Sequence, residues 1–140
     1  MMISILSRLR AFRRAFGRED GIEGLPGTTI IMIGLIVFFV TALQVAFWYI
    51  GQNVAQVSAN SAYQQARSYQ ASNTDGVTAG QQILAAHPGE LNNTTVNVTR
   101  TVGTVTVTVT GQPASILPGF PLPPITKTLT GPIEQWIPGP

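Results

Sequence analysis

The side chains that most often perform catalysis are few in this chain. There is a single histidine, His87, and no cysteine, so neither a histidine pair nor a thiolate is present to hold a metal ion. Three of the six carboxylates (Glu19, Asp20 and Glu23) lie close to the N-terminus, and the serines have no base partner at a motif spacing. His87 precedes Pro88-Gly89, which predicts a helix end rather than a catalytic site. We therefore predict no enzymatic activity, no metal and no cofactor.

One long uncharged segment determines how the rest of the chain is organised. The run from Thr28 to Ile50 contains no charged side chain, although charged residues make up 10% of the whole chain. At about 1.5 Å per residue it would reach about 35 Å as a helix, more than the hydrocarbon core of a bilayer, about 30 Å. The sequence thus predicts three parts: a basic cytoplasmic arm (1–27), a transmembrane helix (28–50) and an exported head (51–140).

The flanks of this segment indicate its orientation. Five arginines precede it (Arg8, Arg10, Arg13, Arg14 and Arg18), whereas the charges that follow it balance. Because basic flanks stay on the cytoplasmic side, we expect a single-pass protein of the cell membrane whose C-terminal part is exported. A cleaved signal peptide is the alternative. The run is longer than the usual apolar core of about 7–15 residues and lacks an Ala-x-Ala ending, which favours a retained anchor.

The basic arm has a pattern of its own. Ile5, Leu9, Phe12 and Phe16 fall on one helical face among the arginines, which fits either a helix lying at the lipid headgroups or a solvated tether. The glycines and Pro26 between 24 and 27 are expected to end any helix before the membrane segment begins.

The transmembrane helix is expected to continue past Gly51, to about Ser72. Small and aromatic residues recur there at spacings of four and three: Ala55, Ala59, Ala62, Ala66 and Tyr69. Such a seam either forms a core face of the head or packs against other copies of the chain. Within the membrane segment Gln44 is strongly polar, and we expect it to bond to a neighbouring helix. Residues 73–76 predict a turn, followed by a short second helix over 77–86.

The rest of the head alternates with period two. Val96 and Val98 alternate with polar residues, and Val105, Val107 and Val109 alternate with threonines, which predicts two strands joined through residues 100–104. A third strand is expected over 125–130, after the proline-rich segment 113–124. Three strands with one apolar face need the helices as cover. The predicted fold class is α+β: a transmembrane helix that continues as an amphipathic helix packed on a small antiparallel sheet.

This layout resembles TadE-like proteins, the minor pilins or pseudopilins of the tight-adherence (Flp) branch of type IV pili, and the actinobacterial members above all. Residues 27–70 and 103–133 carry the resemblance. It implies a membrane-anchored subunit in pilus assembly, secretion or cell adhesion, whose partners are copies of itself, sister pilins and inner-membrane assembly proteins, with no nucleic acid and no small-molecule substrate. It also implies peptidase processing between Gly27 and Thr28. Met32, however, stands five residues after Gly27, where type IV prepilins have a glutamate, so we expect an anchored accessory subunit more readily than the bulk of a filament.

A second hypothesis belongs to another class. The chain would then be a generic single-pass membrane protein whose small ectodomain binds a ligand or a protein. A pocket in the head lined by converging polar groups would favour this hypothesis.

Overall fold

The computed structural model describes residues 25–139. The amphipathic pattern at residues 5–16 lies outside this range. The chain divides into two compact units, Met1–Val40 and Thr41–Pro140. The second unit begins inside the segment predicted to cross the membrane.

The first described element is a long helix, α2 (Leu25–Arg67). It passes through Gly51 without a break, as predicted. Pro26 and Gly27 form part of its first turn, so α2 begins three residues before the predicted Thr28. Proline is tolerated there, since an N–H in the first turn has no partner within the helix. Any helix of the basic arm that residues 24–27 were expected to end lies outside the described residues. α2 ends at Arg67, earlier than the predicted Ser72, and the left-handed φ of 62° at Gln70 turns the chain away.

The second helix, α3 (Asn73–Ala86), starts earlier than predicted. Residues 73–76 were interpreted as a turn, but they form the first turn of α3. The cause is a capping box: the Ser72 hydroxyl accepts a hydrogen bond from the Asp75 backbone N–H, and the Asp75 carboxylate accepts one from the Ser72 backbone N–H. Serine followed three residues later by an acid is a sequence signal for this start, and it outweighs the turn preference of Asn73 and Gly76.

Three antiparallel strands form one sheet in the order β1-β2-β3, where β1 is Leu91–Arg100, β2 is Thr104–Pro113 and β3 is Ile125–Pro132. All three strands were predicted, and the third is longer than expected because Gly131 and Pro132 still pair with β2. The register sets Val98 opposite Val107, and Val107 opposite Leu129. The predicted α+β class is confirmed.

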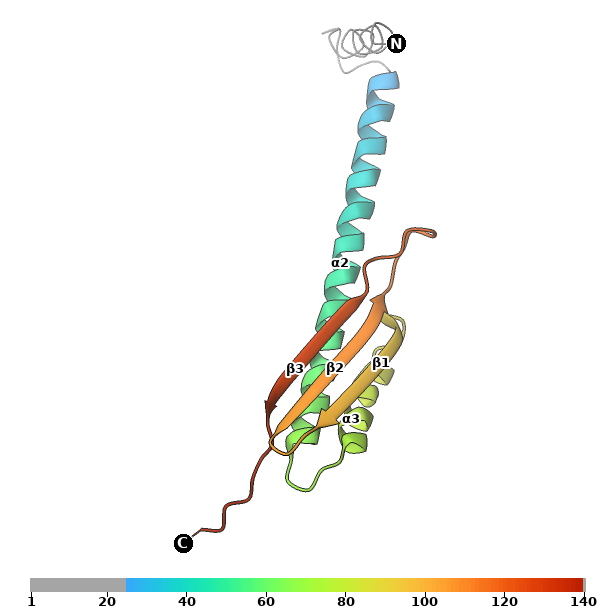
Figure 1. Ribbon diagram of the computed structural model, residues 1–140. Helices are drawn as coiled ribbons and strands as arrows, with labels where there is room; N and C mark the ends of the chain where they lie inside the picture. The colour runs from blue at the N-terminus through green and yellow to red at the C-terminus, as the bar shows by residue number, and fades with distance from the viewer. Residues whose placement is uncertain (1–24, 140) are drawn as a thin grey trace, which may run out of the picture. The chain divides into compact units, whose positions relative to one another are not determined.

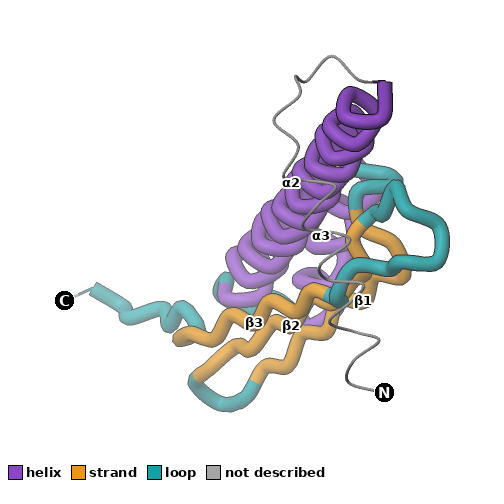
Figure 2. The backbone as a smooth tube through the Cα atoms, turned by 90° about the horizontal axis from the view of Figure 1, so that it is seen from above, coloured by secondary structure: helices purple, strands orange, loops and turns teal. Residues whose placement is uncertain are grey.

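One face of the sheet is covered by α3 and by the C-terminal part of α2, from Gly51 onward (Figures 1 and 2). The side chains of Val105, Val107 and Val109 point to this face and are completely buried. The threonines between them lie on the other face, where Thr106 pairs with Thr130, and Thr108 with Thr128, through their hydroxyls. The predicted alternation of buried valines and outward threonines is therefore confirmed.

Candidate functional site

The first part of α2 exposes apolar side chains around its whole circumference. Large side chains from Ile30 to Phe39 are all more than half exposed, up to 73% for Phe38. Each exposed apolar group is unfavourable in water by about 25 cal/mol per Å². The helix is long and apolar enough to cross a membrane.

Gly27 and Thr28, the predicted processing position, lie in the first turns of α2 and are exposed. Met32 is 53% exposed. The residues of the processing motif therefore share the same open apolar surface as the rest of the predicted membrane segment.

Gln44 has its hydrogen-bond partners within its own chain. Its Nε2 donates to the Ser115 Oγ over 2.9 Å, and its Oε1 accepts from the Ile116 N–H over 3.1 Å. Gln44 is only 8% exposed. The expectation that Gln44 bonds to another helix is thus wrong, because the connection between β2 and β3 satisfies both ends of its amide. Nothing in the local sequence around Gln44 marks a partner 71 residues away.

The alanine seam faces the interior of the head. Ala55, Ala59, Ala62 and Ala66 are completely buried in one cluster with the valines of β1 and β2. These alanines are therefore unavailable for packing against another copy, and the seam forms a core face, one of the two alternatives predicted. Tyr69 lies beyond the end of α2, is 59% exposed and does not join the cluster.

Glycines of α3 allow the two helices to approach closely, a feature that the sequence analysis missed. A Cβ atom on Gly76 would lie 2.8 Å from the Ala66 Cβ, and one on Gly80 would lie 3.2 Å from the Ala62 Cβ. A side chain on Gly76 would therefore force a shift of its surroundings, and one on Gly80 would require its neighbours to move by a few tenths of an ångström. The sequence does carry a signal for this contact. Gly76 and Gly80 are four residues apart, the same spacing as Ala62 and Ala66.

The outward face of α2 in the head is a separate surface. Asn53, Val57, Asn60 and Gln64 follow one another at spacings of four, three and four, and all are exposed. We call these four residues the outer stripe. The outer stripe is open to another molecule.

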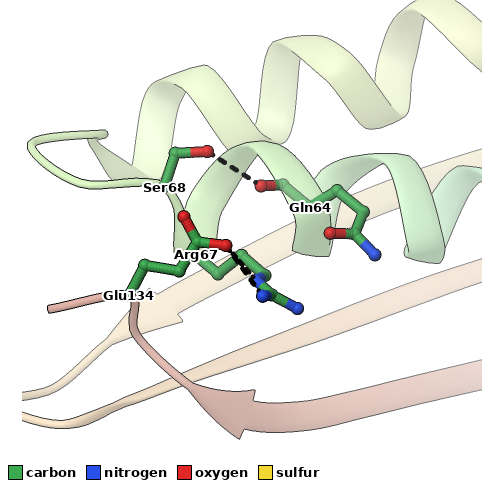
Figure 3. A network of polar contacts seen from close by, with 4 residues as sticks. All are labelled: Gln64, Arg67, Ser68 and Glu134. Carbon is green, nitrogen blue, oxygen red and sulfur yellow. Dashed lines mark hydrogen bonds and ion pairs between the residues drawn. The ribbon is translucent and has the colours of Figure 1, made fainter.

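The far end of α2 is tied to the residues after β3 (Figure 3). Both Nε and Nη2 of Arg67 donate to the Glu134 Oε1, at 3.1 and 2.7 Å, and the Glu134 N–H donates to the Arg67 carbonyl. Nearby, an open hollow of about 610 Å³ is lined by residues that include Tyr69, Arg100 and Trp136. The Arg100 Nη1 is buried without a hydrogen-bond partner. The hollow therefore combines aromatic surface with a guanidinium group.

Two further titratable groups, His87 and Asp75, lie at the two ends of α3. His87 follows the last residue of α3, and its Nδ1 lies 2.9 Å from the Ile83 carbonyl oxygen, so its predicted place at a helix end is confirmed. No three His, Asp or Glu side chains in this range are grouped so that they would hold a metal ion. The backbone N–H and then the hydroxyl of Ser72 hold the pKa of Asp75 below its usual value of 3.8.

Comparison with known proteins gives no match: no family model, no curated protein and no solved structure is similar to this chain.

Proposed function

We propose that this chain is a membrane-anchored, TadE-like pilin subunit that acts as a structural or accessory component of a Tad/Flp-type pilus or a related secretion assembly. The apolar part of α2 anchors it in the cell membrane with the N-terminus in the cytoplasm. The head is exported and presents its surface to other subunits.

One observation carries this proposal: α2 is a single helix with two kinds of surface. Its first part is apolar and exposed, whereas from Ala55 to Ala66 it supplies a buried face to the core of a small α+β head. A helix of this kind contributes both to a membrane anchor and to a folded head, which suits a subunit that packs laterally.

The outer stripe supports a structural role for the head. Its residues are uncharged and mostly amides, and they lie on a helix whose opposite face is fixed by the core. Neighbouring subunits would therefore meet along Asn53, Val57, Asn60 and Gln64 instead of along the alanine seam.

The ligand-binding hypothesis has one specific observation in its favour. The hollow near Tyr69 is lined by Arg100, whose guanidinium group would donate hydrogen bonds to a bound carboxylate. A chain that binds a ligand there would depend on Arg100, whereas a pilin subunit would depend on the outer stripe.

The two functions are separated by complementation of a deletion strain. Deletion should abolish or shorten surface filaments or block the secretion that they serve, and the wild-type chain should restore them. Val57→Arg should fail to restore them, because it places a charge in the subunit contact. Arg100→Gln is the matched variant outside that contact and should complement. Normal filaments after deletion would contradict the pilin proposal, and failure of Arg100→Gln alone would favour the ligand-binding ectodomain.

A cross-linking experiment tests the proposed contact directly. The chain has no cysteine, so a single cysteine at Asn60 reports only on that position. It should cross-link to another copy or to a sister pilin in native membranes. A cysteine at Thr108, on the opposite side of the head, is the control and should not.

A further inference from the structure

The connection between β2 and β3 has an apolar exterior. Residues 114–121 (Ala-Ser-Ile-Leu-Pro-Gly-Phe-Pro) include no charged side chain, and the nearest charges along the chain are Arg100 and Lys127. Phe120 is 71% exposed, and Ile116 and Leu117 are exposed as well. These three side chains, which we call the apolar tip, give this loop an apolar exterior. Exposure of this apolar surface to water is unfavourable, so we expect an apolar neighbour to cover it.

Several backbone groups of the same loop form hydrogen bonds within the loop itself. Leu117-Pro118-Gly119-Phe120 forms a turn closed by a hydrogen bond of 3.2 Å from the Phe120 N–H to the Leu117 carbonyl, with a left-handed φ of 82° at Gly119. The Ser115 hydroxyl donates to the Phe120 carbonyl over 2.9 Å and accepts from the Leu117 N–H.

Satisfied backbone groups are what a loop needs in order to enter lipid. An unpaired N–H or C=O costs several kcal/mol in the hydrocarbon region, so exposed irregular loops are normally excluded from it. Here the N–H groups of Ile116, Leu117 and Phe120 all have partners. Pro118 and Pro121 have no N–H to satisfy. These bonds lower the backbone cost of presenting the side chains of this loop to lipid.

The position of the contact between this loop and α2 indicates what covers the apolar tip. Ser115 and Ile116 bond to Gln44, which precedes Trp48 on α2 by one helical turn, about 6 Å along the axis. Tryptophan and tyrosine concentrate at the headgroup level of membranes, and Trp48 and Tyr49 are both exposed. The loop thus contacts α2 on the N-terminal side of its aromatic residues, toward the segment proposed to lie in lipid.

We infer that residues 116–120 are a second membrane contact, inserted into the outer headgroup and acyl boundary of the bilayer that holds α2. The inference rests on the membrane anchor of the proposed function. Ile116, Leu117 and Phe120 enter the lipid, at a depth of about 5–10 Å as for other interfacial apolar groups. The Gln44 amide fastens the loop to the helix, and two attachments separated along the chain restrict the tilt and rotation of the head on the membrane.

The test uses single cysteines in the full-length chain, reconstituted in phosphatidylcholine–phosphatidylglycerol vesicles and labelled with an environment-sensitive fluorophore. Phe120→Cys reports on the tip. Phe38→Cys reports on the anchor, and Val102→Cys is the matched exposed apolar position at the opposite end of β2. Lipids that carry a nitroxide at the start of the acyl chain quench probes at the boundary and are used for Phe120 and Val102, whereas lipids that carry it near the end of the acyl chain quench probes at the bilayer centre and are used for Phe38.

The inference expects the Phe120 and Phe38 probes to shift to shorter wavelength and to be quenched, while the Val102 probe does neither. A probe at Ile116 should give the same result as the probe at Phe120. Agreement between the two positions would show that the result is not caused by a local disturbance from one label. If the Phe38 probe is quenched and the Phe120 and Ile116 probes behave like Val102, the loop inference is overturned and the anchor stands. If the Phe38 probe is not quenched, the anchor itself is overturned, and the loop inference with it.

Discussion

The hydroxyl of Ser58 on α2 donates a hydrogen bond of 2.9 Å to the carbonyl oxygen of Gly80 on α3. Ser58 is completely buried. The bond lies beside the close contact between Gly80 and Ala62, so one small patch provides both polar pairing and steric fit between the helices. This patch fixes α3 against α2 and thereby places both helices over the sheet.

Gly76→Ala should destabilise the head. The new methyl group would lie 2.8 Å from the Ala66 Cβ and 3.0 Å from the Ala62 carbonyl oxygen, and the latter is backbone that cannot move cheaply. Overpacking costs about 1–3 kcal/mol, partly offset by about 0.5–1 kcal/mol from the better helix propensity of alanine. We expect a net loss of about 1 kcal/mol, and at most about 2.5 kcal/mol, in the free energy of unfolding, measured by denaturant titration of the full chain in detergent.

Gly103→Ala is the matched control, because a Cβ at that position meets no atom within 4 Å. It should change stability by less than about 0.5 kcal/mol. Equal effects of the two substitutions would show that the close approach of α2 and α3 does not limit packing.

The strands could be predicted from the sequence because a period of two and β-branched residues determine them locally. Val105, Val107 and Val109 alternate with threonines, and no other regular structure places those valines on one face. The continuity of α2 through Gly51 was also predictable, since no proline interrupts it. The start of α3 was misjudged because a capping signal at Ser72 and Asp75 competed with residues typical of turns.

The partners of Gln44 could not be predicted from the sequence. Ser115 lies 71 residues away, and the bond exists only because the sheet brings the β2–β3 connection beside α2. A polar residue in an apolar helix indicates a need for a partner, but not whether that partner belongs to the same chain. The function of the alanine seam was ambiguous for the same reason, since small residues permit close packing without specifying the neighbour.

The capping box predicts a dependence of stability on pH. Because the folded-state pKa of Asp75 lies below 3.8, the carboxylate is stabilising above that pH, and its contribution is lost as the pH falls through the folded-state pKa. Asp75→Asn should therefore flatten the pH dependence of the melting of α3 below about pH 4, followed by circular dichroism. Ser72→Ala should lose only part of it, since the backbone N–H that donates to Asp75 remains. Unchanged profiles in both variants would contradict this role.

The ion pair between Arg67 and Glu134 should contribute little to stability. Its side chains are 34% and 53% exposed, so water and salt screen the attraction. A double-mutant cycle with Arg67→Ala and Glu134→Ala should give a coupling energy of about 0.2–1 kcal/mol, decreasing with added salt. A coupling well above this range would show that the guanidinium stacked 5.8 Å from the Tyr63 ring centroid forms part of a larger cooperative unit.

Val107 and Thr108 test the two faces of the sheet. Val107→Ala removes buried methyl groups from the core and should cost about 2 kcal/mol. Thr108→Ala loses only a hydroxyl contact of 3.3 Å with Thr128 on the outer face and should cost less than about 1 kcal/mol. Denaturant titration of both variants gives the comparison. A larger loss from Thr108→Ala would mean that the outer face is covered in the intact protein.

Gln44→Leu should release the β2–β3 loop while leaving the rest of the head intact. The substitution keeps the apolar volume but leaves the Ile116 N–H without its acceptor and removes the Nε2 donor to Ser115. A buried donor left unsatisfied costs about 1–3 kcal/mol, so the loop should open locally. Hydrogen exchange should then speed up by about one to two powers of ten at Ile116 and Leu117, with little change at Val107. Gln64→Leu, on the outer stripe, is the control and should leave exchange in the loop unaltered. Equal protection of the loop in the wild type and in Gln44→Leu would mean that its turn holds the loop closed without α2.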